Sequence, residues 1–216
     1  MTITQCGKDI PPEKLALHQA RCSRCGGKPP HPPGSRHLPD YFSSQEAVDI
    51  IATADAWHWK VLFWVLWETG ARIGEALRLK RKDFLPGQHL LGIETEKRAD
   101  HYYGLLPVSS DLCDELAGYI GALPARQQFL FPYTVDGATK ALKRTAVRTG
   151  ITRPIRTHMW RHALGKRLAR ELQLPELDAL NIIRQQLRHK GWRSVRVYVE
   201  VTPRDAAEQV RKVLEA

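Results

Sequence analysis

The sequence has 216 residues, of which 43% are hydrophobic and 26% are charged. These values are ordinary for a globular protein with a buried core, and they exclude a wholly disordered chain. The longest apolar run, Val61 to Trp67, is much shorter than a bilayer span, and the N-terminus has no signal-peptide pattern. We therefore exclude membrane and secreted classes and expect a cytoplasmic protein.

The net charge of +10 is unevenly distributed along the chain. Residues 1–140 hold 16 basic and 16 acidic side chains, whereas residues 141–216 hold 17 basic and 7 acidic ones. Most of these cations are arginines, whose planar forks suit phosphate groups. The distribution indicates a polyanion-binding face, with nucleic acid as the expected partner. A cationic surface that serves solubility alone is the alternative.

The first 25 residues hold a cluster of possible metal ligands: Cys6, His18, Cys22 and Cys25. A segment this short cannot fold by hydrophobic burial alone, and a structural Zn²⁺ would supply the missing stabilisation. We therefore predict a Cys/His-rich head over residues 1–27 with a structural zinc site. A disordered tail with incidental cysteines is the alternative. Residues 28–37, rich in Pro and Gly, predict a stiff linker.

The main domain is predicted over residues 38–216. Its first part contains helices at 43–54, 61–68 and 72–81, then two strands at 89–94 and 102–107 that a charged turn joins. Further helices are predicted at 111–120, 135–149, 157–171, 175–187, 192–199 and 203–215. The predicted fold class is therefore mainly α with a small antiparallel β-sheet (α+β). Cys113 lies in a helical pattern and is expected in the core.

Three clusters of polar residues in this domain could carry chemistry. In the first, Arg72 follows Gly70 at the start of a predicted helix, where free N–H groups and the helix dipole favour anions. Glu75 lies three residues further along and within reach of Arg72. The cluster therefore suits anion binding, and a surface ion pair between Arg72 and Glu75 is the alternative.

The second cluster contains His158 and Arg161, which a helix would place on one side. An imidazole beside a guanidinium suits proton transfer next to a phosphate, and a structural role for both is the alternative. In the third cluster, Tyr198 follows His189 by nine residues and has arginines around it. A phenol is a poor nucleophile near its ordinary pKa of about 10, unless cations stabilise the phenolate. A buried core tyrosine is the alternative here.

In this order, the three clusters resemble the tyrosine recombinase (phage integrase) family. The family motif Thr-Gly-x-Arg-x-x-Glu matches residues 69–75, and its His-x-x-Arg-His motif matches residues 158–162. Its Leu-Gly-His followed nine residues later by Tyr matches residues 187–198, apart from the glycine. The resemblance covers about residues 40–216, so it implies that the main domain folds like a tyrosine recombinase catalytic domain.

Three departures from the family pattern stand out. Arg188 replaces the glycine before the last histidine, which is expected to shift the backbone at that turn or to add a DNA contact. The family's catalytic lysine lies in a β-hairpin turn, where Lys97 is the matching residue and Arg98 is a competitor. The family's N-terminal helical DNA-clamping domain has no counterpart, and only the cysteine head stands in its place.

The resemblance implies a site-specific DNA recombinase or integrase of the kind found on mobile genetic elements. Such an enzyme cleaves and rejoins DNA strands through a 3′-phosphotyrosyl intermediate and needs no cofactor for catalysis. The implied partners are double-stranded DNA and further copies of the chain, which form a tetramer on nucleoid DNA. The implied catalytic residues are Arg72, Lys97, His158, Arg161, His189 and the nucleophile Tyr198.

Two alternatives to this function remain open. One is a DNA-relaxing or end-resolving enzyme that uses the same tyrosine chemistry without strand exchange between sites. The other is a catalytically silent DNA-binding protein that has kept the fold. The intact set of candidate residues argues against a silent protein, whereas the missing clamp domain is compatible with one.

Overall fold

The computed structural model describes residues 40–95, 103–172, 174–189 and 195, together with the backbone of residues 2–3 and 9–10. The chain divides into two compact units, Met1–Leu38 and Pro39–Ala216. In the first unit, strands β1 (Thr2–Ile3) and β2 (Asp9–Ile10) form an antiparallel pair. The four ligands predicted to hold zinc lie outside the described residues.

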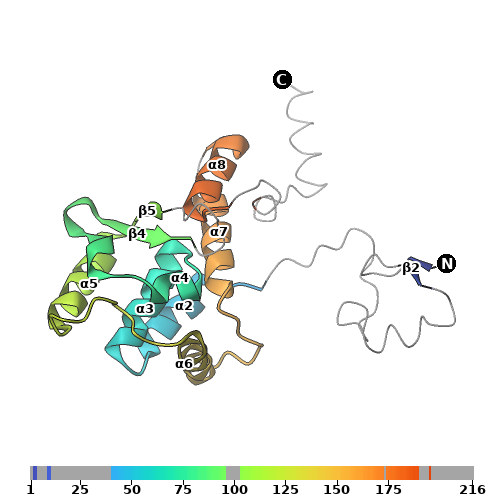
Figure 1. Ribbon diagram of the computed structural model, residues 1–216. Helices are drawn as coiled ribbons and strands as arrows, with labels where there is room; N and C mark the ends of the chain where they lie inside the picture. Colours follow the sequence, from blue (N-terminus) through green and yellow to red (C-terminus); the bar gives the residue numbers. More distant parts are fainter. Residues whose placement is uncertain are drawn as a thin grey trace. The chain divides into compact units, whose positions relative to one another are not determined.

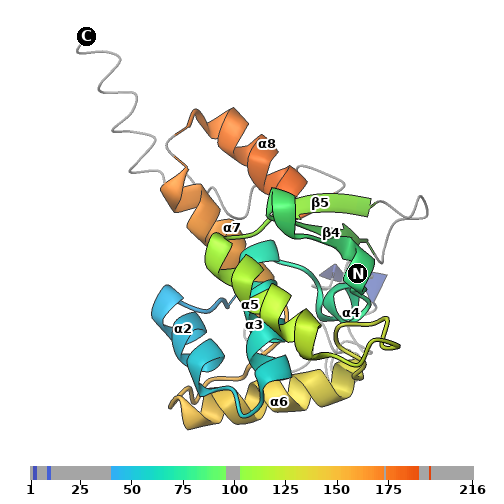
Figure 2. The ribbon, with the colours of Figure 1, turned by 90° about the vertical axis from the view of Figure 1, so that its left-hand side faces the viewer.

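The second unit is built around helix α3 (Trp57–Thr69), which is apolar on nearly all sides and therefore becomes the central helix. Four helices pack against it: α2 (Ser44–Thr53), α5 (Ser110–Ala122), α6 (Val135–Arg148) and α7 (Met159–Glu171). Figures 1 and 2 show α3 enclosed by these helices. Their buried side chains form one large hydrophobic cluster. Cys113 belongs to it, as expected.

Helix α2 begins with the capping box that its sequence predicts. The Ser43 hydroxyl accepts a hydrogen bond from the Glu46 N–H (3.2 Å), and the Glu46 carboxylate accepts one from the Ser43 N–H (2.8 Å). Arg153, in the segment before α7, also binds both oxygens of the Glu46 carboxylate. These bonds lower the pKa of Glu46 to about 2. The start of α2 is therefore tied to a segment 107 residues away.

Helix α4 (Ile73–Leu77) is much shorter than the predicted helix over residues 72–81. The chain after it pairs with a distant segment instead: the Leu79 carbonyl accepts a hydrogen bond from the Leu130 N–H (2.8 Å). Two short 3₁₀ turns follow, η1 (Arg81–Asp83) and η2 (Pro86–Gln88). The helical pattern of residues 72–81 was therefore overridden by tertiary pairing.

The second unit contains a three-stranded antiparallel sheet in the order β3 (Phe84–Leu85), β4 (Leu90–Glu94) and β5 (Tyr103–Pro107). Strands β4 and β5 confirm the two predicted strands, with Leu91 paired to Leu106 across them. Strand β3 was not predicted, since two residues carry no periodicity.

Helix α8 (Glu176–Gln186) packs on α7 and closes a second, smaller hydrophobic cluster. The helices predicted over 192–199 and 203–215 fall, apart from Val195, outside the described part of the chain. None of the described helices combines the length and the apolar character that a bilayer crossing needs. The predicted fold class is confirmed: the described residues of the second unit are mainly helical, with one small antiparallel sheet.

Candidate active site

Arg72 and Glu75 form a partly buried ion pair at the start of α4. Arg72 is the residue immediately before the helix, and its N–H donates a hydrogen bond to Glu75 Oε2 (2.9 Å). Its side chain returns to the same carboxylate, with Arg72 Nη1 donating to Glu75 Oε1 (2.6 Å). The predicted position of Arg72 at a helix start is confirmed. The ion pair that the alternative proposed is present, although its carboxylate is buried and only Arg72 is partly exposed.

Arg161 lies in the first turn of α7 and is buried. Its Nη1 donates to the Gly70 carbonyl (2.8 Å), and its Nη2 donates to the Leu187 carbonyl. Gly70 ends α3 and Leu187 ends α8. Carbonyls at helix C-termini lack partners within their own helix and carry partial negative charge. The Arg161 guanidinium therefore links the C-terminal ends of α3 and α8, and these two hydrogen bonds hold its side chain in position.

Gly70 is needed where α3, α7 and α8 meet. Its φ of 58° lies in the left-handed region that favours glycine. A Cβ on this residue would lie 2.7 Å from Leu187 Cδ2 and 3.0 Å from Leu164 Cδ2. Glycine thus allows the end of α8 to approach the end of α3, which brings the Leu187 carbonyl to Arg161.

Three imidazoles surround the arginines. His158 lies exposed immediately before α7, whereas His162 and His189 are half-buried. Burial and the charges of His158 and Arg161 lower the pKa of His162 to about 4. Burial, followed by the nearby charges of Arg161 and Arg72, lowers the pKa of His189 to about 3. Both imidazoles are therefore neutral near pH 7.

Hydrogen bonds bring three of the predicted catalytic residues together, and the fourth lies near them in the sequence. Arg188, which precedes His189, shares the Glu75 carboxylate with Arg72, and Arg161 donates to the carbonyl of Leu187, two residues before His189. His158 lies three residues before Arg161, at the start of α7. The four residues come from α4, the start of α7 and the turn after α8, segments that are far apart in the sequence. Two guanidinium groups and neutral imidazoles in one place can bind a phosphate and donate hydrogen bonds to it.

Arg188, which replaces the family glycine before His189, lies in the interior of the site. Its side chain is buried, and its Nη2 donates to Glu75 Oε2 (2.9 Å). Its φ of 52° is left-handed, so the backbone keeps a conformation that glycine favours. The arginine at this position is therefore a buried member of the site that contacts Glu75, and the DNA contact predicted for it stays a prediction.

A model of the phage integrase family matches residues 40–204, which is more than half of the chain. The chain belongs to the phage integrase family. This match confirms the resemblance predicted from three sequence clusters. Members of this family are DNA strand-transferring recombinases.

Solved structures of tyrosine recombinases have the same fold as this integrase-family chain. XerA recombinase is 19% identical with a TM-score of 0.66, and 82% of this chain covers 65% of it. XerH recombinase bound to its difH substrate is 19% identical with a TM-score of 0.68, and 81% of this chain covers 55% of it. The catalytic domain of bacteriophage HP1 integrase is 18% identical with a TM-score of 0.59 (80% of this chain, 94% of that domain).

This chain therefore spans between about half and two thirds of the two Xer recombinases and nearly all of the HP1 catalytic domain. A search of curated protein sequences found no match.

Two predicted catalytic residues of this integrase-family chain, Lys97 and Tyr198, lie outside the described residues. The strands on either side of Lys97 in the sequence are described, and Glu94 at the end of β4 pairs with Tyr103 at the start of β5. The Tyr103 ring lies over Gly92, and its hydroxyl donates to Asp83 Oδ1 (3.0 Å). Burial and Asp83 raise the pKa of Tyr103 to about 12. This phenol therefore remains protonated and anchors the hairpin.

Sequence reasoning did not assign Glu75, His162 and Arg188 to the site, although all three belong to this integrase-family cluster. Glu75 and His162 stand inside the matched motifs, so their positions carried a signal. The replacement of a family glycine was a signal for Arg188. No signal in the sequence indicated that Arg188 would pair with Glu75, which lies 113 residues away.

Proposed function

We propose that this chain is a site-specific DNA recombinase or integrase that cleaves and rejoins strands through a 3′-phosphotyrosyl intermediate. The observation that carries the proposal is the convergence of Arg72, Arg161 and His189, with His158 at the edge, inside a phage integrase fold. Such a cluster of cations and neutral imidazoles suits a phosphate whose negative charge grows in the transition state. A mobile genetic element is the proposed natural context.

In the proposed first step, the Tyr198 oxygen attacks the phosphorus of a DNA phosphodiester and the bond to the 5′-oxygen breaks. Lys97 gives a proton to the leaving 5′-oxygen, and His158 takes the proton of the tyrosine or hydrogen-bonds to the phosphate. Arg72 and Arg161 stabilise the non-bridging oxygens. His189, neutral because of its lowered pKa, adds a hydrogen bond as an N–H donor.

In the proposed second step, a 5′-hydroxyl of another strand attacks the phosphotyrosyl phosphorus and releases the tyrosine. Each step replaces one phosphate ester by another, so the energy of the phosphodiester is conserved. The reaction therefore needs neither a nucleotide nor a metal ion, and this is the logic of covalent catalysis in two matched halves.

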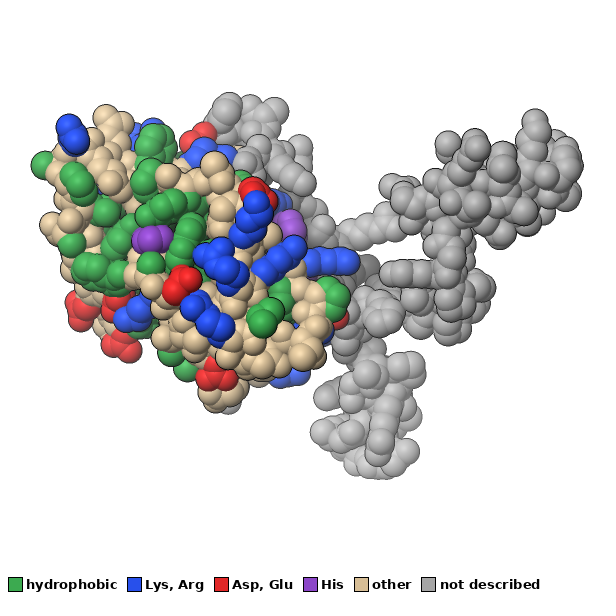
Figure 3. Space-filling view, turned by 90° about the horizontal axis from the view of Figure 1, so that it is seen from below, with side chains coloured by type: hydrophobic (Ala, Val, Ile, Leu, Met, Phe, Trp, Pro, Cys, Tyr) green, Lys and Arg blue, Asp and Glu red, His purple; other side chains and the backbone are tan. Residues whose placement is uncertain are grey.

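The proposed DNA-binding surface includes exposed cations of α6 and of the segment that follows it: Lys140, Lys143, Arg144, Arg148 and Arg156. Figure 3 looks onto the side where α6 lies and shows Lys and Arg side chains gathered there. The XerH structure holds its difH DNA, which supports duplex DNA as the partner. We further propose a tetramer on nucleoid DNA, and a structural zinc held by the head.

The test is a nicked suicide duplex that carries the DNA flanking the chain's own gene. The unsubstituted protein should form a covalent protein–DNA adduct, whereas Tyr198→Phe should form none because the attacking oxygen is missing. DNA binding by Tyr198→Phe should stay within a few-fold of the unsubstituted value. Tyr133→Phe, which removes an exposed hydroxyl from a different segment, should form the adduct normally. An adduct that persists in Tyr198→Phe would remove this residue from the mechanism.

A further inference from the structure

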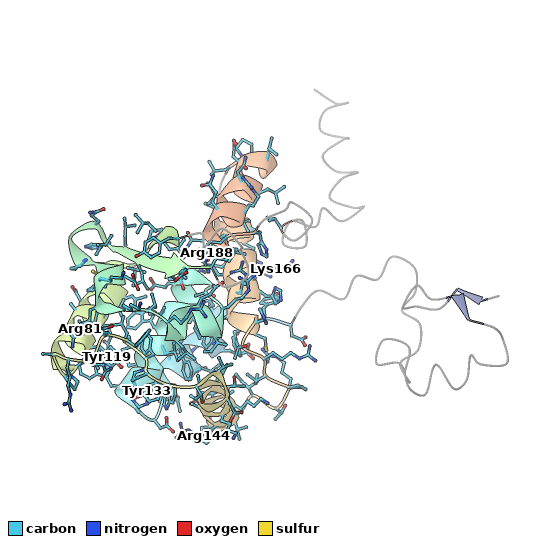
Figure 4. All side chains as sticks on the ribbon, viewed as in Figure 1. Arg81, Tyr119, Tyr133, Arg144, Lys166 and Arg188 are labelled. Atoms are coloured by element: carbon cyan, nitrogen blue, oxygen red, sulfur yellow. The ribbon has the colours of Figure 1, made fainter. Side chains whose placement is uncertain are left out.

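We infer that Arg188 is a positioning residue which, through the shared carboxylate of Glu75, holds the Arg72 guanidinium ready to bind a phosphate. The inference rests on the proposed function, because it deepens the account of the same site. Figure 4 shows Arg188 below α8, at the turn that leads to His189. No element of the phosphate chemistry proposed above requires an arginine at this position.

The hydrogen bonds of Glu75 link the two arginines. Glu75 Oε1 accepts from Arg72 Nη1 (2.6 Å), and Oε2 accepts from both the Arg72 N–H and Arg188 Nη2 (2.9 Å each). Three bonds from two sides hold the carboxylate in one orientation. Because the Arg72 side chain is bonded to that carboxylate, fixing Glu75 also fixes Arg72.

Arg72 is more exposed than Glu75 and Arg188. The side chains of Glu75 and Arg188 are 0% exposed, whereas that of Arg72 is 18% exposed. Arg72 is therefore the member of the trio that solvent or a ligand can reach. Arg188 is fully buried and its Nη2 donates to Glu75, so its guanidinium meets this carboxylate rather than solvent. This geometry favours a role that acts through Glu75.

The net charge of Arg72, Glu75 and Arg188 also depends on Arg188. Arg72 and Glu75 alone would form a neutral pair, which attracts a phosphate weakly. With Arg188 as a second partner of the buried carboxylate, the trio carries a net charge of +1. Arg188 thus offsets the charge of Glu75 and leaves Arg72 with its attraction for an anion. In a buried site, this effect is poorly screened by solvent.

The backbone supports the same conclusion. Only Arg188 and His89 have a positive φ among the non-glycine residues that the structure describes. Such a conformation is disfavoured for a residue with a Cβ and persists only when its surroundings enforce it. The turn is fixed by the Arg188 N–H, which donates to the Gln185 carbonyl (2.9 Å), and by Arg188 Nη1, which donates to the Gln186 carbonyl (3.1 Å). Arg188 thereby ties the end of α8 to α4.

The experiment compares Arg188→Gly and Arg188→Lys with the unsubstituted chain. Arg188→Gly removes the guanidinium and relieves the left-handed backbone, so a loss of function cannot come from new backbone strain. His89→Gly relieves the same strain at an exposed position and is the matched control. The first measurement is the affinity for inorganic phosphate, by ³¹P NMR titration. The second is the rate of adduct formation on the nicked duplex at saturating DNA.

Arg188→Gly should weaken phosphate binding and slow adduct formation by about tenfold or more, since a small misplacement of a binding group is costly. Its affinity for duplex DNA should fall by a smaller factor than its affinity for phosphate, because Arg188 is buried and the exposed cations that contact the other DNA phosphates are retained. Arg188→Lys, which keeps the charge, should recover part of both losses. The His189 imidazole should titrate at a higher pH in Arg188→Gly, since a neighbouring cation is gone. His89→Gly should behave like the unsubstituted chain.

A double substitution tests the route through Glu75. In a Glu75→Gln background, Arg188→Gly should cause a clearly smaller loss of phosphate affinity than in the unsubstituted chain, because only the charge of Arg188 and not its hold on Arg72 is then removed; independent residues would give additive losses. Additive losses, or unchanged phosphate binding in Arg188→Gly, would overturn the inference. So would the absence of phosphate binding by the unsubstituted chain. If the unsubstituted chain binds phosphate but forms no adduct, the proposed function fails and the phosphate comparison still decides the role of Arg188.

Discussion

At the scale of single residues, Gly70 places the strictest demand on the sequence. Its left-handed backbone disfavours a side chain, and a Cβ at this position would lie only 2.7 Å from Leu187 Cδ2. We predict that Gly70→Ala lowers the free energy of unfolding by about 2 kcal/mol or more, because backbone strain and a steric clash add together. Chemical denaturation measures this loss.

Gly150 provides the control for this prediction. Its φ of 80° is also left-handed, but a Cβ on it would have no neighbour within 4 Å. Gly150→Ala should therefore show the strain alone, about 1 kcal/mol. Equal losses in the two variants would mean that the contact between Gly70 and Leu187 has no energetic weight. Gly70→Ala should also lose phosphate affinity, since Leu187 supplies an acceptor to Arg161.

Residue spacing predicted part of this site and missed the rest for a physical reason. Arg72, His158 and Arg161 were found because short motifs place them on known positions of a helix. The position of His189 followed from its spacing to a tyrosine. The bond between Arg188 and Glu75 joins residues 113 apart, and the left-handed backbone that permits it leaves no periodic pattern. Long-range contacts of this kind are decided by the fold.

At the scale of secondary-structure elements, Arg81 fixes how α5 ends. Its guanidinium donates to four carbonyls (2.9–3.0 Å), of Ile120, Leu123, Pro124 and Gln127. These lie in the last turn of α5 and just after it, where carbonyls lack helical partners. Figure 4 shows Arg81 beside α5. The arginine thereby joins the segment before β3 to the loop that follows α5.

We predict that Arg81→Lys lowers the free energy of unfolding by about 2 kcal/mol, because an ammonium group cannot reach four carbonyls in a planar arrangement. The measurement is urea unfolding followed by circular dichroism. Arg126→Lys, at an exposed position in the same loop, should change the free energy by less than about 0.5 kcal/mol. A loss in Arg126→Lys as large as that in Arg81→Lys would show that the loop is sensitive to any substitution.

The elements that were predicted well are those whose stability is local. The capping box at Ser43 and the alternation in β4 and β5 need no distant partner to be recognised. The segment after Leu77 was predicted as helix because Leu77 and Leu79 fit a helical pattern. Pairing of Leu79 with Leu130 made it extended instead. Propensity is thus a weak guide where a distant segment offers hydrogen bonds.

At the scale of the whole molecule, the described cations of residues 141–216 lie in two kinds of environment. Some are internal: Arg161 and Arg188 are buried in the site, and Arg167 lies 4.3 Å from the centre of the Trp67 ring. Others are exposed on α6 and after it, as Figure 3 shows. Composition alone predicted a concentration of positive charge, but it overstated how much of that charge is exposed.

The lowered pKa values of His162 and His189 make the stability of the folded chain depend on pH. The pKa of His162 lies at about 4 and that of His189 at about 3 in the folded chain, against 6.5 for an unperturbed histidine. Below pH 6.5 the unfolded chain therefore takes up protons that the folded chain does not. Because protons then favour unfolding, the free energy of unfolding should fall as the pH drops from about 6.5 to about 4.

This loss occurs in a different pH range from that of the carboxylates. Glu46, whose pKa is lowered from 4.5 to about 2, contributes stability that is complete above pH 4.5 and is lost only below it. Between pH 6.5 and 4.5 the imidazoles therefore dominate the pH dependence of the free energy of unfolding, with a slope of up to about 1.4 kcal/mol per pH unit for each group.

Urea unfolding at several pH values in this range should show a smaller slope in His189→Gln than in the unsubstituted chain. His89→Gln, which replaces an exposed imidazole, should leave the slope unchanged. The same slope in all three proteins would mean that burial and the neighbouring arginines do not keep His189 neutral, and its proposed role as an N–H donor would lose its basis.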